Sequence, residues 1–556
     1  MSDESSTGAL QHDALENLGD FTTTTRVLPI AALAIVIGVF AAYVAAALLR
    51  LINFFTNLFF FQRVSVEAAS PATNHLGLFV VVVPIVGAFI VGLMARYGSD
   101  KIRGHGIPEA IEAILMKQSR VEPKVALLKP ISAAISIGSG GPFGAEGPII
   151  MTGGAFGSLI AQFFHLTAAE RKTLLVAGAA AGMSATFAAP VASVVLAVEL
   201  LLFEWKPRSI IPVALASATA AAMRRYILGV GPVFAVPVHS LTVGWEGLAG
   251  CVVAGLLAGV LSALLTNAVY ASEDAFHRLP IHWMWWPPIG GLIIGLGGLM
   301  FPQALGVGYD VIDRLLQGDV PTRLILGVLV VKSIIWSTSL GSGTSGGVLA
   351  PLLMMGAALG AAEAHILPME GAGFWPLVSL GAVLAGTMRA PLTGVVFALE
   401  LTHDVNMLLP LLIAVTVSHS FTVLTLKRSI LTEKISRRGY HLSQEYSIDP
   451  LEIIFAREVA REVPEHVVAE ARASGVVAHA DEPLRIIAYR MAEKGLTRLP
   501  VIASDGSTSG VIELSDLLTA RSRVLDAEQR RERTLGTKGQ LRAIAALFGG
   551  DRPHTT

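Results

Sequence analysis

The segment GSGGPFGAEGPIIMTGGAFG, residues 138–157, returns 203 positions later as GSGTSGGVLAPLLMMGAALG, residues 341–360. Nine of the 20 aligned positions are identical, and in both copies a glycine-rich stretch precedes a proline that begins an apolar run. Proline suits the first turn of a helix because its missing N–H would have no partner there. Glycine lets the backbone turn tightly and approach a ligand. The pattern predicts the same kind of loop-to-helix junction in each half of the chain.

Two further pairs of segments repeat in the same order. AGMSATFAAPVASVVLAVEL (181–200) aligns with AVLAGTMRAPLTGVVFALEL (382–401) at an offset of 201, and GHGIPEAIE (104–112) aligns more weakly with GVGYDVID (306–313) at an offset of 202. Sequences rich in Gly and Ala can look alike by chance, but here prolines and one glutamate of each copy also align. We infer an internal duplication. In transporters such halves are often inverted, and binding sites form at broken helices near the bilayer midplane.

Composition indicates a membrane protein. The 556-residue chain is 53% hydrophobic and 15% charged, whereas soluble domains carry about 25% charged residues. Six stretches lack Asp, Glu, Lys and Arg altogether: 27–49, 76–95, 173–198, 247–272, 333–362 and 407–426. Each has roughly the 20 residues that a helix needs to cross a bilayer. We therefore predict an all-α polytopic protein with the lipid bilayer as a partner. The net charge of −1 gives no indication of a nucleic-acid partner.

Changes in composition suggest how the chain is divided. The expected parts are a cytoplasmic N-terminal segment (1–26), two membrane repeats (27–240 and 241–438), a linker with a soluble domain (439–525) and a charged tail (526–556). Basic residues follow the last apolar run, at positions 427, 428, 434, 437 and 438. Because basic residues concentrate on the cytoplasmic side, we expect both termini to face the cytoplasm from a plasma or inner membrane.

Glu146 is a lone acid inside the first glycine-rich loop. A helix start presents free N–H groups and about half a positive charge, so several starts aimed at one point can hold an anion without a cationic side chain. A carboxylate beside such a site competes with the anion for those N–H groups, and acids within the membrane are candidates for function. We expect Glu146 to block when deprotonated and to open when protonated or swung away. The alternative is an ordinary helix cap.

These loops resemble those of the chloride channel (CLC) family of anion channels and proton-coupled anion antiporters, over about residues 27–438. GHGIP resembles the family's GSGIP, GAEGP resembles G(K/R)EGP, and GSGTSGGVLAP resembles GSGxxGGxFxP. The resemblance implies the CLC inverted-repeat fold with discontinuous helices, a homodimer with one pore per subunit, and chloride or a similar anion, with protons, as transported ions. It makes Glu146 the gate. The anion-binding positions carried over are His105, Gly106, Gly144, Gly147, Val348 and Leu349.

Three departures from the family pattern bear on mechanism. His105 replaces the central serine, Leu431 replaces a tyrosine, and Leu200 stands where proton-coupled antiporters have an inner glutamate. An imidazole retains a possible N–H donor and titrates near neutral pH, so we expect His105 to contact the anion. The alternative is a neutral His105 that is bonded to a backbone carbonyl and faces away.

Because leucine cannot carry a proton, Leu200 favours channel-like or weakly proton-coupled chloride transport. Two alternatives stay open: coupled proton/chloride exchange by a non-standard route, and a preference for fluoride, since a related branch also departs at the central serine. Glu199 lies beside Leu200 but about 100° away around a helix. Because Glu199 matches Glu400 in the other half, both glutamates suit capping or interhelical bonding.

The soluble part, DEPLRIIAYRMAEKGLTRLPVIASDGSTSGVIELSDLLTAR (481–521), resembles a CBS module, with the order helix, strand, turn, strand, helix. We expect one small α/β cytoplasmic module per subunit, pairing across the dimer. Gly510 and Asp516 fit a nucleotide loop of the type G-x-x-T-x-x-D, but Glu513 replaces the threonine and would repel phosphate. A structural role is therefore favoured over adenine-nucleotide binding.

Enzymatic chemistry has little support in the sequence. The membrane part contains no recognisable catalytic triad, metal-ligand cluster or phosphate-binding P-loop. We expect a transport protein without a metal or cofactor. The alternative from another class is a membrane enzyme or nucleotide sensor that works through its C-terminal part.

Overall fold

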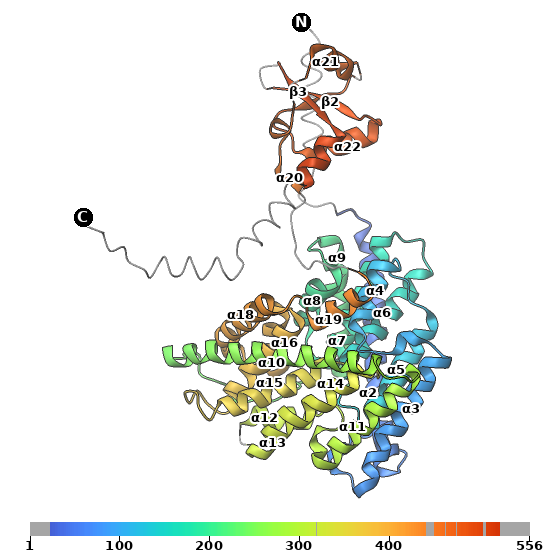
Figure 1. Ribbon diagram of the computed structural model, residues 1–556, viewed down its shortest axis with the longest axis vertical. Coiled ribbons are helices and arrows are strands. Elements are labelled where there is room, and N and C mark those ends of the chain that lie inside the picture. Colours follow the sequence, from blue (N-terminus) through green and yellow to red (C-terminus); the bar gives the residue numbers. More distant parts are fainter. Residues whose placement is uncertain are drawn as a thin grey trace, which may run out of the picture. The chain divides into compact units, whose positions relative to one another are not determined.

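The computed structural model describes residues 23–318, 320–440, 450–461, 463–473, 475–503 and 507–522. They belong to two compact units that divide between Gln444 and Glu445. The larger unit is helical and the smaller unit contains a three-stranded sheet (Figure 1). The predicted N-terminal segment lies outside the described residues except for positions 23–26, and the predicted tail 526–556 lies wholly outside them.

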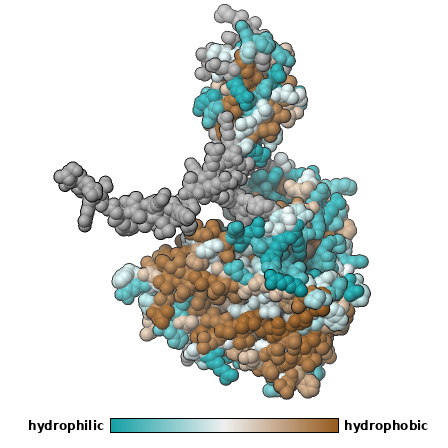
Figure 2. All heavy atoms as spheres, in the orientation of Figure 1, coloured by the Kyte–Doolittle hydropathy of each residue, from teal (hydrophilic) through white to brown (hydrophobic). Residues whose placement is uncertain are grey.

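Five helical stretches of the described residues are long and apolar enough to cross a membrane. They are Val27–Phe61, Gly77–Tyr97, Trp245–His277, Thr322–Gly341 and Val405–Arg437. Hydrophobic residues dominate the face of the larger unit that Figure 2 shows. Exposed hydrophobic residues of the larger unit include Val253, Leu256 and Leu264 of α10 (Trp245–His277) and Leu296 of α11 (Trp286–Met300). Exposed apolar surface of this extent fits lipid contact, and four of the six predicted runs lie in these stretches.

The other two predicted runs do not form single helices, so that expectation was wrong. In 173–198, helix α7 (Ala168–Phe187) ends before Ala188, which has φ of 55°, and α8 (Pro190–Ala197) begins at a proline. Pro190 cannot donate the hydrogen bond that would continue α7. In 333–362, a glycine-rich loop separates α14 (Ser333–Gly341) from α15 (Leu349–Glu363).

The two halves pack in the same way. In the first half, α2 (Val27–Phe61) contacts α7 and α9 (Pro207–Ile227), and α7 also contacts α6 (Glu146–Gln162) and α9. In the second half, α10 contacts α16 (Phe374–Met388) and α18 (Leu408–Thr425), and α16 also contacts α15 and α18. The first half contains α3 (Val82–Tyr97), α4 (Ile107–Met116), α5 (Pro123–Gly138), α6 (Glu146–Gln162), α7, α8, the π-helical turn η4 (Val198–Leu202) and α9 (Pro207–Ile227). The second contains α10, α11, α12 (Tyr309–Gln317), α13 (Thr322–Leu326), the π-helical turn η7 (Gly327–Lys332), α14, α15, α16 (Phe374–Met388), α17 (Pro391–Thr402), α18 (Leu408–Thr425) and α19 (Ile430–Arg437).

Helices from opposite halves also meet, as α3 meets α11 and α8 meets α17. At the second crossing the carboxylate of Glu199 accepts the N–H groups of Leu392 (3.0 Å) and Thr393 (2.9 Å), at the start of α17. The carboxylate of Glu400 accepts those of Val191 (3.0 Å) and Ala192 (2.7 Å), at the start of α8. The predicted capping role of both glutamates is confirmed.

The smaller unit follows the predicted order of elements. Its helix α22 (Leu484–Lys494) leads to β2 (Arg498–Ile502) and β3 (Thr508–Glu513), which pair antiparallel, and residues 514–522 are helical. The short β1 (Ala478–His479) adds to β2 in parallel. Apolar residues of α22 recur every three or four positions and form the core with the strands: Leu484, Ile487, Met491, Leu499, Val501 and Ile512. Two further short helices, α20 (Pro450–Ile453) and α21 (Glu465–Arg472), precede β1.

Candidate functional site

Three glycine-rich loops from distant parts of the sequence meet inside the larger unit. Gly104 pairs with Ser345 in a parallel bridge, and Gly144 pairs with Gly347 in an antiparallel bridge. In the second bridge the N–H of Gly347 donates to the Gly144 carbonyl at 2.8 Å, and the N–H of Gly144 donates to the Gly347 carbonyl at 3.1 Å. These bridges bring the starts of α4, α6 and α15 together, as the repeats predicted.

Glycine is required where these loops touch. A Cβ atom at Gly106 would lie 2.4 Å from the carbonyl oxygen of Gly147, and one at Gly147 would lie 1.8 Å from the carbonyl oxygen of His105. Gly106 also has φ of 92°, which side chains other than hydrogen rarely allow. The backbones therefore approach more closely than any other residue would permit.

Glu146 is fully buried at the centre of this junction. Helix α6 begins at Glu146 itself, with Ala145 at the N-cap, so Pro148 lies within its first turn. The carboxylate lies against Gly347, where an added Cβ would be 2.9 Å from Oε2, and it faces the backbone N–H of Ala350. Oε2 has no hydrogen-bond partner among the described residues. The negative group thus lies between the starts of α6 and α15.

His105 lies on the adjacent loop, just before α4. The residue is buried, with 4% of its surface exposed. Its Nδ1 atom has no hydrogen-bond partner in the part of the chain that the structure describes. The alternative prediction was a neutral His105 bonded to a backbone carbonyl and facing away. No backbone carbonyl accepts a hydrogen bond from Nδ1 in the described residues. Nδ1 is therefore open to a ligand, and it is a donor in the tautomer that carries the proton there.

The N–H groups expected to bind the anion fall into two sets. Those of Gly106 and Gly144 are already used, because Gly106 donates to Oε2 of Glu109 at 2.8 Å and Gly144 donates within its bridge. Both N–H groups thus have partners within the protein in this structure, and a role for Gly106 and Gly144 in anion binding stays a prediction. Gly147 lies in the first turn of α6, while Val348 is the N-cap and Leu349 the first residue of α15. First-turn N–H groups have no partner within their helix, so these three positions keep a donor role open.

The two leucines at replaced family positions lie in the hydrophobic core. Leu200 belongs to η4 and Leu431 is the second residue of α19, and neither exposes any surface. Their side chains offer no donor, acceptor or titratable group. Apolar packing therefore fills both positions.

Lys129 supports the His105 loop in a way that the sequence analysis missed. Its buried ammonium donates to the carbonyl oxygens of Ile102 (2.8 Å) and Gly104 (2.7 Å). The cation therefore fixes the backbone immediately before His105. The signal was a lysine in the middle of an apolar helix whose other charged residue, Lys124, lies at its start.

Lys332 does the same in the second half, 203 positions later. Its ammonium donates to the carbonyl oxygens of Ala304 (2.9 Å) and Gly306 (2.7 Å), in the loop before α12. That loop leads to Tyr309, whose hydroxyl donates to Oε1 of Glu146 at 3.3 Å. Tyr309 is part of GVGYDVID, the weakest of the three repeats, and we had assigned it no role.

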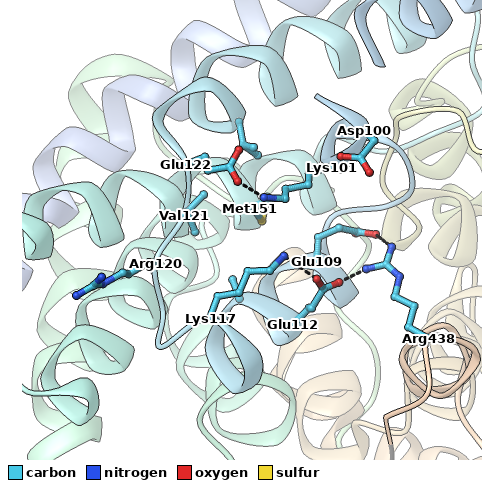
Figure 3. A pocket seen from close by; sticks show the side chains of 12 residues that line it. Asp100, Lys101, Glu109, Glu112, Lys117, Arg120, Val121, Glu122, Met151 and Arg438 are labelled. Carbon is cyan, nitrogen blue, oxygen red and sulfur yellow. Dashed lines mark hydrogen bonds and ion pairs between the residues drawn. The ribbon is translucent and has the colours of Figure 1, made fainter. Parts of the chain in front are cut away.

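A pocket of about 340 Å³ lies beside α4 (Figure 3). Figure 3 shows Glu109, Glu112 and Arg438 pointing toward one another, and Oε1 of Glu109 pairs with Arg438 and with Lys434, each at 3.4 Å. Because the other oxygen of Glu109 accepts the Gly106 N–H, this residue links the charged pocket to the His105 loop. The remaining lining residues are Asp100, Lys101, Ala113, Lys117, Arg120, Val121, Glu122, Val125 and Met151.

Comparisons with known proteins agree with this architecture. Residues 86–422 match the family model described as voltage gated chloride channel, and residues 465–523 match the CBS domain. A Klebsiella pneumoniae protein named H(+)/Cl(-) exchange transporter ClcA is 32% identical over 406 residues, which cover 68% of this chain and 83% of the relative. A ClcB-like chloride channel protein of Ralstonia nicotianae is 32% identical over 343 residues, covering 60% of this chain and 80% of the relative.

Solved structures show the same fold. A slow cyanobacterial Cl⁻/H⁺ antiporter superposes with a TM-score of 0.67 at 22% identity, covering 75% of this chain and 99% of the other. A CLC-type fluoride/proton antiporter gives 0.62 at 19% identity, with 74% and 98% covered. The CLC-type fold and the attached CBS domain are thereby confirmed, and the chain belongs to the voltage gated chloride channel (CLC) family.

Proposed function

We propose that this protein moves chloride or a similar anion across a membrane and that Glu146 is its protonatable gate. One observation carries the proposal: the buried carboxylate of Glu146 lies where the starts of α6 and α15 converge. A carboxylate and a halide carry the same charge and bind the same N–H groups. An anion can occupy this point only when the carboxylate leaves or is neutralised. The exchange and channel activities named for the relatives support an anion as the cargo.

We propose further that proton coupling is weak or absent, because Leu200 provides no proton acceptor on the inner side. A coupled proton/anion exchanger is the second candidate, and the exchangers among the relatives favour it. Such a protein would need another inner route. His105 lies on the loop at Gly106, and Oε2 of Glu109 accepts the Gly106 N–H, so these two residues are candidates for that route.

Flux measurements test the gate. The purified full-length protein is placed in liposomes, and chloride efflux is followed between pH 4.5 and 8. We expect efflux to vary with pH in the native protein and to lose most of that variation in Glu146→Gln and Glu146→Ala. Glu246→Gln, which changes an exposed glutamate at the start of α10, is the matched control. Efflux from Glu146→Gln that keeps the native pH profile would contradict the gate.

Proton movement separates the two modes. Under an outward chloride gradient without a pH gradient, a coupled exchanger moves protons across the liposome membrane, and an uncoupled protein does not. We expect little proton movement per chloride. Repeating the measurement with fluoride tests the anion preference. A fixed ratio of protons to chloride would establish exchange instead.

We propose that two copies associate, each with its own pore, in a plasma or inner membrane with both termini in the cytoplasm. We also propose that the CBS module is structural and that the protein needs no metal or cofactor and catalyses no reaction. Asp516 supports a structural role for the CBS module, because its carboxylate accepts the Glu513 N–H at 2.9 Å and pairs with Arg461. The mass of the detergent-solubilised protein and calorimetry with ATP test these points.

A further inference from the structure

Tyr309 reaches the gate from the opposite half of the molecule. It is the first residue of α12 in the second repeat, whereas Glu146 begins α6 in the first. The phenol O–H donates to Oε1 of Glu146 at 3.3 Å. This oxygen is distinct from Oε2, which lies toward Gly347. Both oxygens border Gly144, and Oε1 is the one that accepts the phenol hydrogen bond.

The tyrosine ring is held firmly. Its centroid lies 6.3 Å from that of Phe187 in an edge-on contact and 6.2 Å from that of Phe234. The loop before Tyr309 is tied by Lys332 through two carbonyl groups. A phenol fixed by aromatic packing and by an anchored loop loses little freedom when it forms a hydrogen bond. The hydroxyl is therefore pre-positioned for the carboxylate.

A simpler explanation is that a buried tyrosine hydroxyl needs some partner and has found one. That explanation does not depend on which group the phenol meets. Here the partner is the one acid that competes with the anion, so the bond has a consequence. Every contact that stabilises the carboxylate at the helix starts makes displacement by an anion less favourable.

We propose that Tyr309 is a positioning residue that latches the carboxylate of Glu146 in the blocking position. The proposal rests on the proposed gating role of Glu146 and adds the hydroxyl that sets how strongly an anion must compete. With Leu431 at the family's tyrosine position, the phenolic donor of this protein acts on the gate from the second half.

Chloride binding to the purified full-length protein tests the latch by calorimetry at pH 7.5. Tyr309→Phe keeps the ring and removes the donor. Since a hydrogen bond to a charged group is worth more than one factor of ten in an equilibrium constant, we expect chloride to bind about tenfold more tightly. In liposomes the chloride concentration for half-maximal flux should fall in parallel, with a smaller change in maximal flux. In a Glu146→Gln background, Tyr309→Phe should change binding less than twofold.

Controls distinguish the latch from other causes. Tyr270→Phe removes another buried phenol hydrogen bond, to the carbonyl of Ile430, and should leave chloride binding unchanged. Tyr309→Met also lacks a donor and should show the same gain should Tyr309→Phe not fold. If chloride binding is unchanged or weaker in both Tyr309 variants while Glu146→Gln differs from native, the latch is contradicted and the gating role of Glu146 stands. A Glu146→Gln protein indistinguishable from native would overturn the gate beneath it.

Discussion

Glu199 caps the start of α17, the helix that contains Glu400, and Glu400 caps the start of α8, the helix that leads to Glu199. The carboxylate of Glu199, just after α8, binds the first N–H groups of α17, and the carboxylate of Glu400, within α17, binds those of α8. A carboxylate at a helix start satisfies orphan donors and complements the helix dipole. The duplication therefore yields a reciprocal pair in which each half completes the other.

Neutralising either glutamate should destabilise the protein without stopping transport. Glu199→Gln loses the charge assistance of three hydrogen bonds and Glu400→Gln that of two, and we expect each change to lower the free energy of unfolding by about 1–2 kcal/mol. Thermal unfolding in detergent measures the effect, and chloride efflux measures function. Lost proton movement in Glu199→Gln at native stability would instead place this residue on a proton route.

Lys332, in the second repeat, should contribute more to the free energy of unfolding than an exposed lysine does. Lys332→Met leaves two buried carbonyl groups without a donor, at about 1–3 kcal/mol each, so we expect a loss of about 2–6 kcal/mol or failure to fold. Lys427→Met, at an exposed position, should change stability by less than about 0.5 kcal/mol. Equal melting temperatures for the two variants would contradict the anchoring role.

Two glycines of the same helix should respond differently to alanine. In Gly147→Ala the new methyl group would lie 1.8 Å from the backbone oxygen of His105, so the loops must separate, and we expect loss of chloride binding or of folding. In Gly154→Ala the nearest atom is a terminal methyl of Leu175 at 3.3 Å, which can move. That variant should bind chloride normally and gain slightly from helix propensity. Binding and melting temperature of both variants provide the comparison.

The histidine on the first loop should contribute a donor. His105→Ala removes it, and we expect chloride affinity to fall about tenfold. His105→Ser restores the hydroxyl of the family pattern and should stay within about threefold of native affinity. His365→Ala, at an exposed histidine outside the junction, is the control. Calorimetric titration with chloride distinguishes these outcomes, and native affinity in His105→Ala would rule out contact with the anion.

Acid should weaken the CBS module through Glu482. Partial burial raises the pKa of this carboxyl, but hydrogen bonds from Arg490 (2.9 and 2.8 Å) and from the N–H of His479 (3.0 Å) outweigh it, so the pKa lies below its ordinary value. A depressed pKa stabilises the fold at neutral pH, and this contribution is lost as pH falls through the folded-state value. We expect Glu482→Gln to lower stability by about 1 kcal/mol at pH 7.

The difference from native should shrink below about pH 4, where the carboxyl of the unfolded chain is protonated. Hydrogen–deuterium exchange of β2 in the full-length protein, corrected for intrinsic rates, gives the measurement. Glu493→Gln, at an exposed position on α22, should show no such pH-dependent difference. A constant deficit for Glu482→Gln at all pH values would assign the effect to packing rather than charge.

The repeats and the glycine-rich loops could be found from the sequence, because tight turns and close backbone contacts demand particular residues at fixed spacing. The roles of Tyr309 and Lys332 could not, since each depends on a partner brought close only by the fold. The length of an uncharged run does not reveal the break after α7, which depends on Pro190 and on the positive φ of Ala188. For Gly106, sequence alone does not tell whether a helix-start N–H is free or already bound by a nearby Glu109.

Contact between bare backbones at Gly106, Gly147 and Gly347 also limits how this protein can evolve. These glycines have no side chain that a substitution could shorten to enlarge the space between the loops. A longer side chain at any of them would force the loops to separate. A variant selective for a larger or smaller ion would have to change the few side chains that border this junction of loops, such as those at positions 105 and 309.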